Sequence, residues 1–162
     1  MSPRTLPGSK SITQRALIMA ALAQSPSRLV HPCHCDDTIT LARALTALGI
    51  QIVPEDSDWV VTPAPLCSTN RVLDCGLGAT TLRFLAPGVL HLCAPDTLIA
   101  AAGLRARPHE ALWDALRSCG VPLPDTPTWP VTLTPSADAL PDVITVDTST
   151  TSQALSGLLL HA

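Results

Sequence analysis

Apolar residues recur along the chain with two different spacings, and each spacing predicts a different kind of element. A spacing of three or four residues, bounded by capping residues and glycines, predicts helices that begin near Ser9–Ser11 and cover 38–48, 78–92, 108–119 and 151–161. Runs rich in Val, Ile, Leu and Thr between turn residues predict strands over 28–31, 50–53, 59–62, 71–74, 98–102, 131–134 and 143–146. Sixteen prolines separate these elements and keep them short.

One helical pattern occurs twice. Residues 41–49 and 112–120 share their Leu, Ala-Leu and Gly positions, and residue 112 follows residue 41 by 71 positions. We therefore predict an α+β fold of repeated βαβαββ units, each with helices packed on one face of a mixed four-stranded sheet. Two units are nearly complete. A third begins at Val143, and its helical pattern is still running at Ala162, so we expect this sequence to be part of a longer fold.

Composition and charge argue against several classes of protein. Of the 162 residues, 46% are hydrophobic and only 14% are charged, which is typical of a globular chain with a core and not of a disordered one. The net charge of −3 and the scarcity of aromatic residues argue against nucleic acid as a partner. No apolar run reaches the ~20 residues that a membrane span needs.

The six cysteines leave two interpretations open. A secreted protein could pair them in disulfides, with Met1–Ala23 as a signal sequence. Against this, three of them stand in apolar stretches of predicted strands and helices, where a free thiol packs as a small hydrophobic group: Cys75, Cys93 and Cys119. We favour a reduced protein of the cytoplasm.

A second group of sulfur and imidazole side chains lies close together at His31, Cys33, His34 and Cys35. A metal site is the weaker interpretation here, because zinc-binding cysteine pairs usually leave two to four residues between the ligands. The remaining histidines stand singly on predicted helices, where we expect exposed, non-catalytic positions: His91, His109 and His161.

The strongest candidate for chemistry is the segment Leu6-Pro-Gly-Ser-Lys-Ser-Ile-Thr-Gln-Arg15. Its small residues permit close approach to a ligand, and Ser9 and Ser11 can cap the helix that follows. Lys10 contributes one cation. Arg15 contributes another on the helix face that carries Ser11, because these two residues are four positions apart. Together with the helix dipole, the cations predict a phosphate or carboxylate site, and a capped helix with exposed charges is the alternative.

Three further segments place glycine, hydroxyl or guanidinium groups at predicted helix starts. The first is the Gly- and Thr-rich stretch 76–81 with Arg83 about one turn later, and the second is Arg107 before a helix that starts at Pro108. The third is the hydroxyl-rich run Thr148–Gln153. Because arginine binds carboxylate or phosphate through two parallel hydrogen bonds, four such sites in repeated units predict a cleft for a doubly anionic small molecule.

In this order the four segments resemble the N-terminal part of the 5-enolpyruvylshikimate-3-phosphate (EPSP) synthase family, the 3-phosphoshikimate 1-carboxyvinyltransferases. The motif LPGSKS-x-x-x-RAL at residues 6–17 is highly specific, and the acidic pair at 36–37 fits as well. The resemblance implies a two-domain fold with the active site between the domains. Residues 1–12 would belong to the other domain, and 13–162 would form an incomplete enolpyruvyl transferase domain.

The resemblance also implies a reaction and a set of ligand-binding residues. The enolpyruvyl group of phosphoenolpyruvate would pass to the 5-hydroxyl of shikimate 3-phosphate, in aromatic amino-acid biosynthesis, without a metal ion or organic cofactor. The implied phosphoenolpyruvate site contains Lys10, Ala79, Arg107 and Gln153. The implied shikimate 3-phosphate site contains Lys10, Ser11, Arg15, Thr151, Ser152 and Gln153.

The chain also departs from the family pattern. Leu77 stands where many members have Asn, Ala79 where many have Gly, and Thr151 where Ser is usual. Family members are more than twice as long, and the acid and base of the reaction are expected in the remaining length. Two functions therefore stay open: part of an active transferase, or a catalytically inactive anion-binding fragment or subunit that needs a second chain. A sibling transferase acting on a UDP-sugar fits less well, because its opening motif differs.

Overall fold

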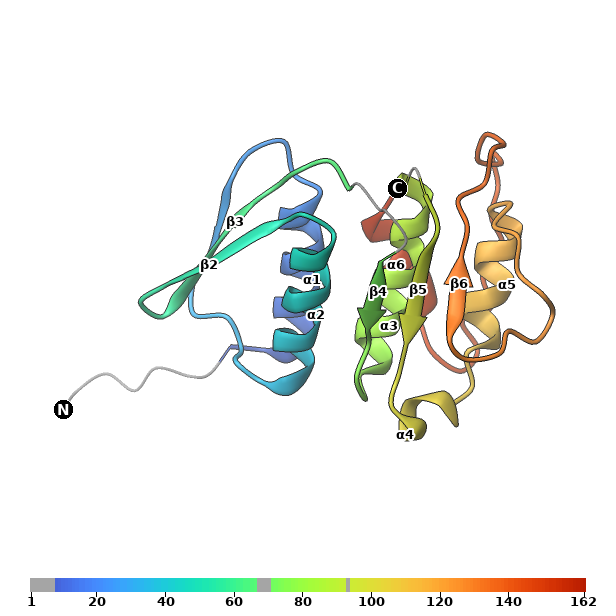
Figure 1. Ribbon diagram of the computed structural model, residues 1–162, viewed down its shortest axis with the longest axis horizontal. Helices are drawn as coiled ribbons and strands as arrows, with labels where there is room; N and C mark the ends of the chain where they lie inside the picture. The colour runs from blue at the N-terminus through green and yellow to red at the C-terminus, as the bar shows by residue number, and fades with distance from the viewer. Residues whose placement is uncertain (1–7, 67–70, 93) are drawn as a thin grey trace.

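The fold consists of two sheet-and-helix units followed by a last helix (Figure 1). The computed structural model describes residues 8–66, 71–92 and 94–162. The first unit comprises α1 (Lys10–Ala21), β1 (Ser27–Leu29), α2 (Asp36–Ala47), β2 (Gln51–Glu55) and β3 (Asp58–Thr62). The second comprises β4 (Val72–Asp74), α3 (Ala79–Leu85), η1 (Ala86–His91), β5 (Asp96–Ile99), α4 (Ala102–Arg105), α5 (Glu110–Ser118) and β6 (Val131–Leu133). The last helix is α6 (Gln153–Leu160).

Each unit contains one small sheet. The first sheet has the order β1-β3-β2 and is antiparallel throughout, with β2 and β3 joined by a tight turn at Asp56–Ser57. Its central strand alternates between buried and half-buried positions, so Trp59 and Val61 face the helices. The second sheet has the order β4-β5-β6 and is mixed, with a parallel β4–β5 pair and an antiparallel β5–β6 pair. The predicted α+β class is confirmed.

The sequence repeat corresponds to a repeated helix ending. After α2 the N–H of Ile50 donates to the carbonyl of Leu45 (3.1 Å), and after α5 the N–H of Val121 donates to that of Leu116 (3.0 Å). In each case the residue before the donor is a glycine in the left-handed region: Gly49 with φ 102° and Gly120 with φ 82°. This is the Schellman ending, which requires a residue without Cβ strain at that position. The conserved spacing of Leu and Gly in the two segments thus produces the same helix stop twice.

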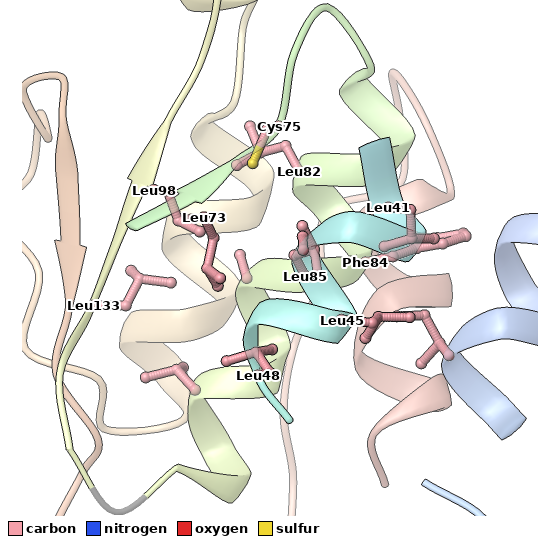
Figure 2. Close-up of a cluster of buried hydrophobic side chains, with 14 of the residues drawn as sticks. Leu41, Leu45, Leu48, Leu73, Cys75, Leu82, Phe84, Leu85, Leu98 and Leu133 are labelled. Carbon is pink, nitrogen blue, oxygen red and sulfur yellow. The ribbon is translucent and has the colours of Figure 1, made fainter. Parts of the chain in front are cut away.

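The core lies where α2 and α3 meet the second sheet (Figure 2). α3 contributes Phe84, which is fully buried, and Leu82. The other large members labelled in Figure 2 come from α2 and its C-cap, from α3 and from all three strands of the second sheet: Leu41, Leu45, Leu48, Leu73, Leu85, Leu98 and Leu133. Each fully buried side chain of this size stabilises the fold by about 1.5–3 kcal/mol. Because its members come from both units, the cluster packs the two units against each other.

Several predicted elements differ from those in the structure. Each sheet has three strands among the described residues, one fewer than expected. The predicted strand 143–146 is wrong, because this segment joins neither sheet and Val143 is 80% exposed. A strand forms only where a neighbour supplies hydrogen bonds, and apolar β-branched residues alone do not provide one. The short helix α4 was not predicted. The helix predicted over 78–92 changes from α to 3-10 geometry at Ala86, in agreement with the bend or end that Pro87 predicts.

Two histidines contradict the expectation of exposed positions. His109 and His161 are 5% and 6% exposed, and their Nε2 atoms lie 2.9 Å from the carbonyl oxygens of Leu104 and Phe84. Burial lowers the pKa of His109, and it lowers the pKa of His161 to about 4. Both rings are therefore neutral parts of the core at pH 7. His91 is exposed, as predicted.

The cysteines that the structure describes are free thiols, and Cys75 and Cys119 are buried as predicted. Cys67 and Cys93 lie outside the described residues. The apolar run at 16–23 forms much of α1, and its Leu17 and Ile18 are core residues. No helix in the described ranges has both the length and the apolar character that crossing a membrane requires.

Candidate anion-binding site

Four helices begin on the same side of the molecule. α1, α2, α3 and α6 have their amino ends toward the lower edge in Figure 1. Side-chain contacts link this edge. Lys10 of α1 reaches Asp37 of α2, and Thr81 of α3 reaches the backbone of Asp37. Arg83, in the last turn of the short helix α3, reaches Gln153 at the start of α6. Because the amino end of a helix carries a partial positive charge, this edge favours anions.

Lys10 forms an ion pair within this edge. Its Nζ lies 2.8 Å from Oδ2 of Asp37, and the hydrogen bond to Asp37 raises the pKa of the lysine. The Lys10 side chain is 53% exposed, so its ammonium group is protonated and accessible. The carboxylate of Asp37 lies in the first turn of α2, where the helix dipole also stabilises it. The sequence did not identify Asp37 as the partner, because 27 residues separate the two.

The glycine of the first motif permits close packing of the backbone within the fold. A Cβ on Gly8 would lie 2.6 Å from the backbone nitrogen of Cys33, too close for any side chain. Ser9 is the N-cap of α1 by its backbone, whose carbonyl accepts the N–H of Thr13 at 2.9 Å. Its hydroxyl makes no capping hydrogen bond within the described chain, so the predicted side-chain cap is wrong.

Arg15 lies on the predicted face of α1, and its guanidinium turns back along that face. Nη1 donates to the carbonyl of Ser11 (3.1 Å) and to its hydroxyl, and Nη2 donates to the hydroxyl of Ser156 in α6 (3.4 Å). The guanidinium carbon also lies 5.1 Å from the ring centre of Phe84, at cation–π distance. Arg15 and Ser11 thus form one polar unit between α1 and α6.

A buried amide aligns the first three helices. The side chain of Gln14 is fully buried, and its Nε2 donates to Oγ1 of Thr81 at 2.9 Å. That hydroxyl in turn donates to the backbone oxygen of Asp37 at 3.3 Å. One polar connection therefore runs from α1 through α3 to α2, just inside the shared edge. The sequence signal for it is a polar residue on the largely apolar buried face of α1.

Arg83 and Arg107 concentrate positive charge at the other half of the edge. Nη1 of Arg83 donates to Oε1 of Gln153 (2.7 Å), and Nη2 donates to the carbonyl of Pro108 (3.2 Å). Burial lowers the pKa of Arg83, and the nearby charge of Arg107 lowers it further. Within the described ranges neither arginine has a carboxylate in an ion pair. Two close guanidinium groups without a counter-ion form a site that an anionic ligand would stabilise.

The remaining candidates also lie at helix starts. Ala79 is the first residue of α3 and is half-buried behind the N-cap Gly78. Ser152 is the exposed N-cap of α6, and Oγ1 of Thr151 accepts the backbone N–H of Gln153 at 3.3 Å. The structure thus brings the predicted residues to one edge in two groups, one around Lys10 and one around Gln153, with α3 between them. The described part of the chain contains no group of three or more His, Cys, Asp or Glu side chains suited to a metal ion.

Comparison with known proteins identifies the family. The family model of EPSP synthase (3-phosphoshikimate 1-carboxyvinyltransferase) matches residues 5–162. The chain belongs to the EPSP synthase family. It is 36% identical over 160 residues to the 3-phosphoshikimate 1-carboxyvinyltransferase of Mycobacterium ulcerans (strain Agy99), covering 96% of this chain and 37% of that protein. A second relative so named, from Kocuria rhizophila, is 34% identical over 170 residues, covering 97% of this chain and 38% of that protein.

Solved EPSP synthases share the fold. Two structures from Acinetobacter baumannii superpose with TM-scores of 0.83 and 0.79, at 23% and 22% identity, and cover 97% of this chain. The match covers 37% of each of those chains. This chain thus spans well under half the length of the curated relatives and of the EPSP synthases it matches.

Proposed function

We propose that the chain binds shikimate 3-phosphate and forms one wall of the phosphoenolpyruvate site of a 3-phosphoshikimate 1-carboxyvinyltransferase. The observation that supports this most directly is the shared edge of helix amino ends, where Lys10, Arg83 and Arg107 contribute three cations. Such an edge suits two substrates that both carry phosphate and carboxylate groups. Membership in the EPSP synthase family selects these substrates among doubly anionic metabolites.

We assign the shikimate 3-phosphate contacts to α1 and α6. Lys10, Ser11 and Arg15 would bind it from α1, and Thr151, Ser152 and Gln153 from the start of α6. In the structure the guanidinium of Arg15 donates to Ser11 and Ser156. Binding of shikimate 3-phosphate would replace these neutral acceptors with an anion. A guanidinium binds a phosphate or carboxylate through two parallel hydrogen bonds between opposite charges, which the neutral serine groups cannot provide, and this favours the exchange.

We assign the phosphoenolpyruvate contacts to Lys10, Ala79, Arg107 and Gln153. Arg83 holds Oε1 of Gln153, so the amide NH2 of that residue is free to point toward a ligand. In the reaction the 5-hydroxyl of shikimate 3-phosphate adds to the enolpyruvyl carbon, and phosphate leaves in the elimination that follows. Proton transfer would be supplied by the remaining length of the family fold. We place the reaction in the cytoplasm and assign no cofactor, nucleic acid or membrane to it.

We also propose a domain organisation, by analogy with the two-domain family fold. Residues 1–12 would belong to the other domain of the family fold, and 13–162 would form two repeat units with the start of a third, so that the boundary falls within the first turn of α1. A second candidate function is an inactive anion-binding fragment or a subunit that is completed by another chain. The chain covers 37% of the Mycobacterium ulcerans relative, and the turnover experiment below distinguishes the two candidates.

Calorimetric titration with shikimate 3-phosphate tests the binding site. We expect Lys10→Ala and Arg15→Ala each to weaken binding at least about tenfold, the effect of one lost charge-assisted contact of ~1.4 kcal/mol or more. Arg43→Ala is the matched control, because Arg43 lies exposed on α2 away from the shared edge. Circular dichroism verifies that each variant is folded. Unchanged affinity in both folded site variants would remove the proposed site.

Turnover distinguishes the two candidate functions. Phosphate release from phosphoenolpyruvate and shikimate 3-phosphate is measured with the chain alone and with the remaining portion of a family member added as a second chain. Activity only in the mixture supports a subunit. Activity of the chain alone contradicts both the fragment and the subunit, and binding without any turnover supports an inactive fragment.

A further inference from the structure

Cys33 and Cys35 form a close pair of thiols just before α2. One residue separates them, and the two thiols share a hydrogen bond. The intervening His34 packs instead against Trp59, with ring centroids 4.9 Å apart. Both cysteines are only partly buried, so small reagents can reach them.

Cys35 is also the N-cap of α2. Its backbone is extended, with φ −142° and ψ 167°, and its sulfur accepts the backbone N–H of Thr38, while Oγ1 of Thr38 accepts the N–H of Cys35 at 3.1 Å. A sulfur in this place faces the positive end of a 12-residue helix. Such a position favours the thiolate, which is the nucleophilic form of cysteine.

The surroundings shift the pKa values of the two thiols in opposite directions. The ammonium group of Lys10 interacts electrostatically with both. Burial works to raise the pKa of Cys35, but hydrogen bonds from Thr38, from the Cys33 thiol and from the backbone of Asp37 outweigh it and lower that pKa. Burial, followed by the hydrogen bond to Cys35, raises the pKa of Cys33. The pair therefore combines a thiol that ionises readily with a neighbour that stays protonated.

We propose that Cys33 and Cys35 are a redox-active dithiol, which hydroperoxides oxidise to an intramolecular disulfide beside Lys10. The Cys35 thiolate attacks one peroxide oxygen of H2O2, the O–O bond breaks, and hydroxide leaves, so that Cys35 becomes a sulfenic acid. The Cys33 sulfur then attacks the Cys35 sulfur, the S–O bond breaks, and the proton of Cys33 leaves with the hydroxyl as water. In sum, two thiols and H2O2 yield one disulfide and two water molecules.

The site would make the first helix edge sensitive to oxidation. The bridge spans a single residue, so we expect it to be strained and readily opened by a dithiol reductant. It also removes the sulfur cap and the thiolate charge next to the Lys10–Asp37 ion pair. The two cysteines lie outside the proposed substrate contacts, and although Lys10 belongs to both sites, the inference does not depend on the proposed function.

Site-resolved mass spectrometry after brief exposure to H2O2 tests the dithiol. The reduced 162-residue chain is oxidised, free thiols are alkylated, and the peptides are analysed. We expect the peptide with Cys33 and Cys35 to lose two hydrogen atoms and to become resistant to alkylation. This oxidation should be at least about tenfold faster than the oxidation of Cys75, because burial raises the pKa of Cys75 to about 12. Equal rates, or bridges only to other cysteines, would overturn the proposal.

Three variants assign the roles within the pair. In Cys33→Ser we expect a sulfenic acid on Cys35 that a dione probe traps, and in Cys35→Ser, whose hydroxyl still caps α2, we expect neither product. Lys10→Gln should slow the oxidation of Cys35 roughly threefold or more, since it removes the neighbouring positive charge. Melting temperatures show that the variants are folded. Two outcomes would contradict the mechanism. One is a disulfide in Cys35→Ser, between Cys33 and another cysteine, that forms as fast as in the parent. The other is a Cys35 that does not react in Cys33→Ser.

Discussion

Single polar residues inside this protein determine how its helices align. Gln14 is fully buried and connects α1 to α3 through Thr81, 67 positions away in the sequence. The second polar atom of the amide, Oε1, has no hydrogen-bond partner among the described residues. A buried amide costs free energy unless its hydrogen bonds are made, so the one bond to Thr81 specifies the alignment of the helices and stabilises it only modestly.

Removing the hydroxyl tests this hydrogen bond. Thr81→Val leaves Nε2 of Gln14 buried without its partner, and we expect the free energy of unfolding to fall by about 1–3 kcal/mol in urea denaturation. Adding Gln14→Leu removes the orphaned amide, so the double variant should regain part of that loss. A double variant that is less stable than Thr81→Val would show that the amide stabilises the fold by other contacts.

The buried imidazole of His161 makes stability depend on pH. Its pKa is about 4 in the folded chain and near 6.5 in the unfolded one, because burial disfavours the charged ring. As pH falls from 6.5 to 4 the unfolded chain binds a proton that the folded chain does not, and the free energy of unfolding decreases by up to about 3 kcal/mol. His109 contributes in the same direction.

Denaturation between pH 7 and 4 measures this effect. His161→Gln keeps an amide donor for the carbonyl of Phe84 but cannot titrate, so we expect a flatter pH profile. His34→Gln is the control, because His34 is exposed, packs against Trp59 in the first unit and should leave most of the slope unchanged. An equal slope in His161→Gln and the parent would mean that other groups carry the pH dependence.

At the scale of elements, α3 and α6 pack closely because of one glycine. A Cβ on Gly157 would overlap the carbonyl oxygen of Arg83, so no larger residue fits between these helices. The same approach positions Gln153, one turn earlier in α6, against the Arg83 guanidinium. The geometry of the second half of the site therefore follows from helix packing.

Gly157→Ala separates packing from helix propensity. In an exposed helix this change stabilises by about 1 kcal/mol, but here we expect a loss of about 1–3 kcal/mol from overpacking, measured by thermal unfolding. Gly103→Ala is the matched control. The new Cβ would meet only the end of the Leu77 side chain, at 3.2 Å, and that side chain is exposed and can move. A stabilised Gly157→Ala variant would show that α6 is not packed on α3 in solution.

At the scale of the whole molecule, α1 leaves one apolar side uncovered. A groove of about 540 Å³ lies between α1 and β1, and three large apolar side chains at it are exposed: Ile12 at 69%, Met19 at 62% and Val30 at 66%. Contiguous exposed apolar surface of this kind binds hydrophobic probes. The opposite side of α1 is fully buried at Leu17, so the helix is apolar on both sides.

Dye binding tests whether this surface is open in solution. We expect the fluorescence of an anilinonaphthalene dye to rise with the chain and to fall by roughly half or more in Ile12→Ser/Met19→Ser. Leu140→Ser is the control, because Leu140 is 51% exposed in a loop outside the groove. Equal fluorescence in the double variant and the control would show that the groove does not bind the dye.

Local features of the fold were predictable from the sequence because they depend on neighbouring residues. The glycines at 49 and 120 end α2 and α5 in the left-handed conformation that such an ending requires. The turn at Asp56–Ser57 follows from polar residues between two apolar runs. The motif around Lys10 likewise indicated an anion site at a helix start, because charge and helix end lie within a few residues.

The partners of those residues became apparent only in three dimensions. Asp37 pairs with Lys10 across 27 positions, and Arg83 holds Gln153 across 70. Such contacts depend on which helix faces pack together, and no periodicity within one element encodes that choice. The same reason explains the buried His109 and His161, whose surroundings come from other elements. Short-range sterics and hydrogen bonding thus set the ends of the helices, whereas long-range packing set the charge and burial of the groups at the site.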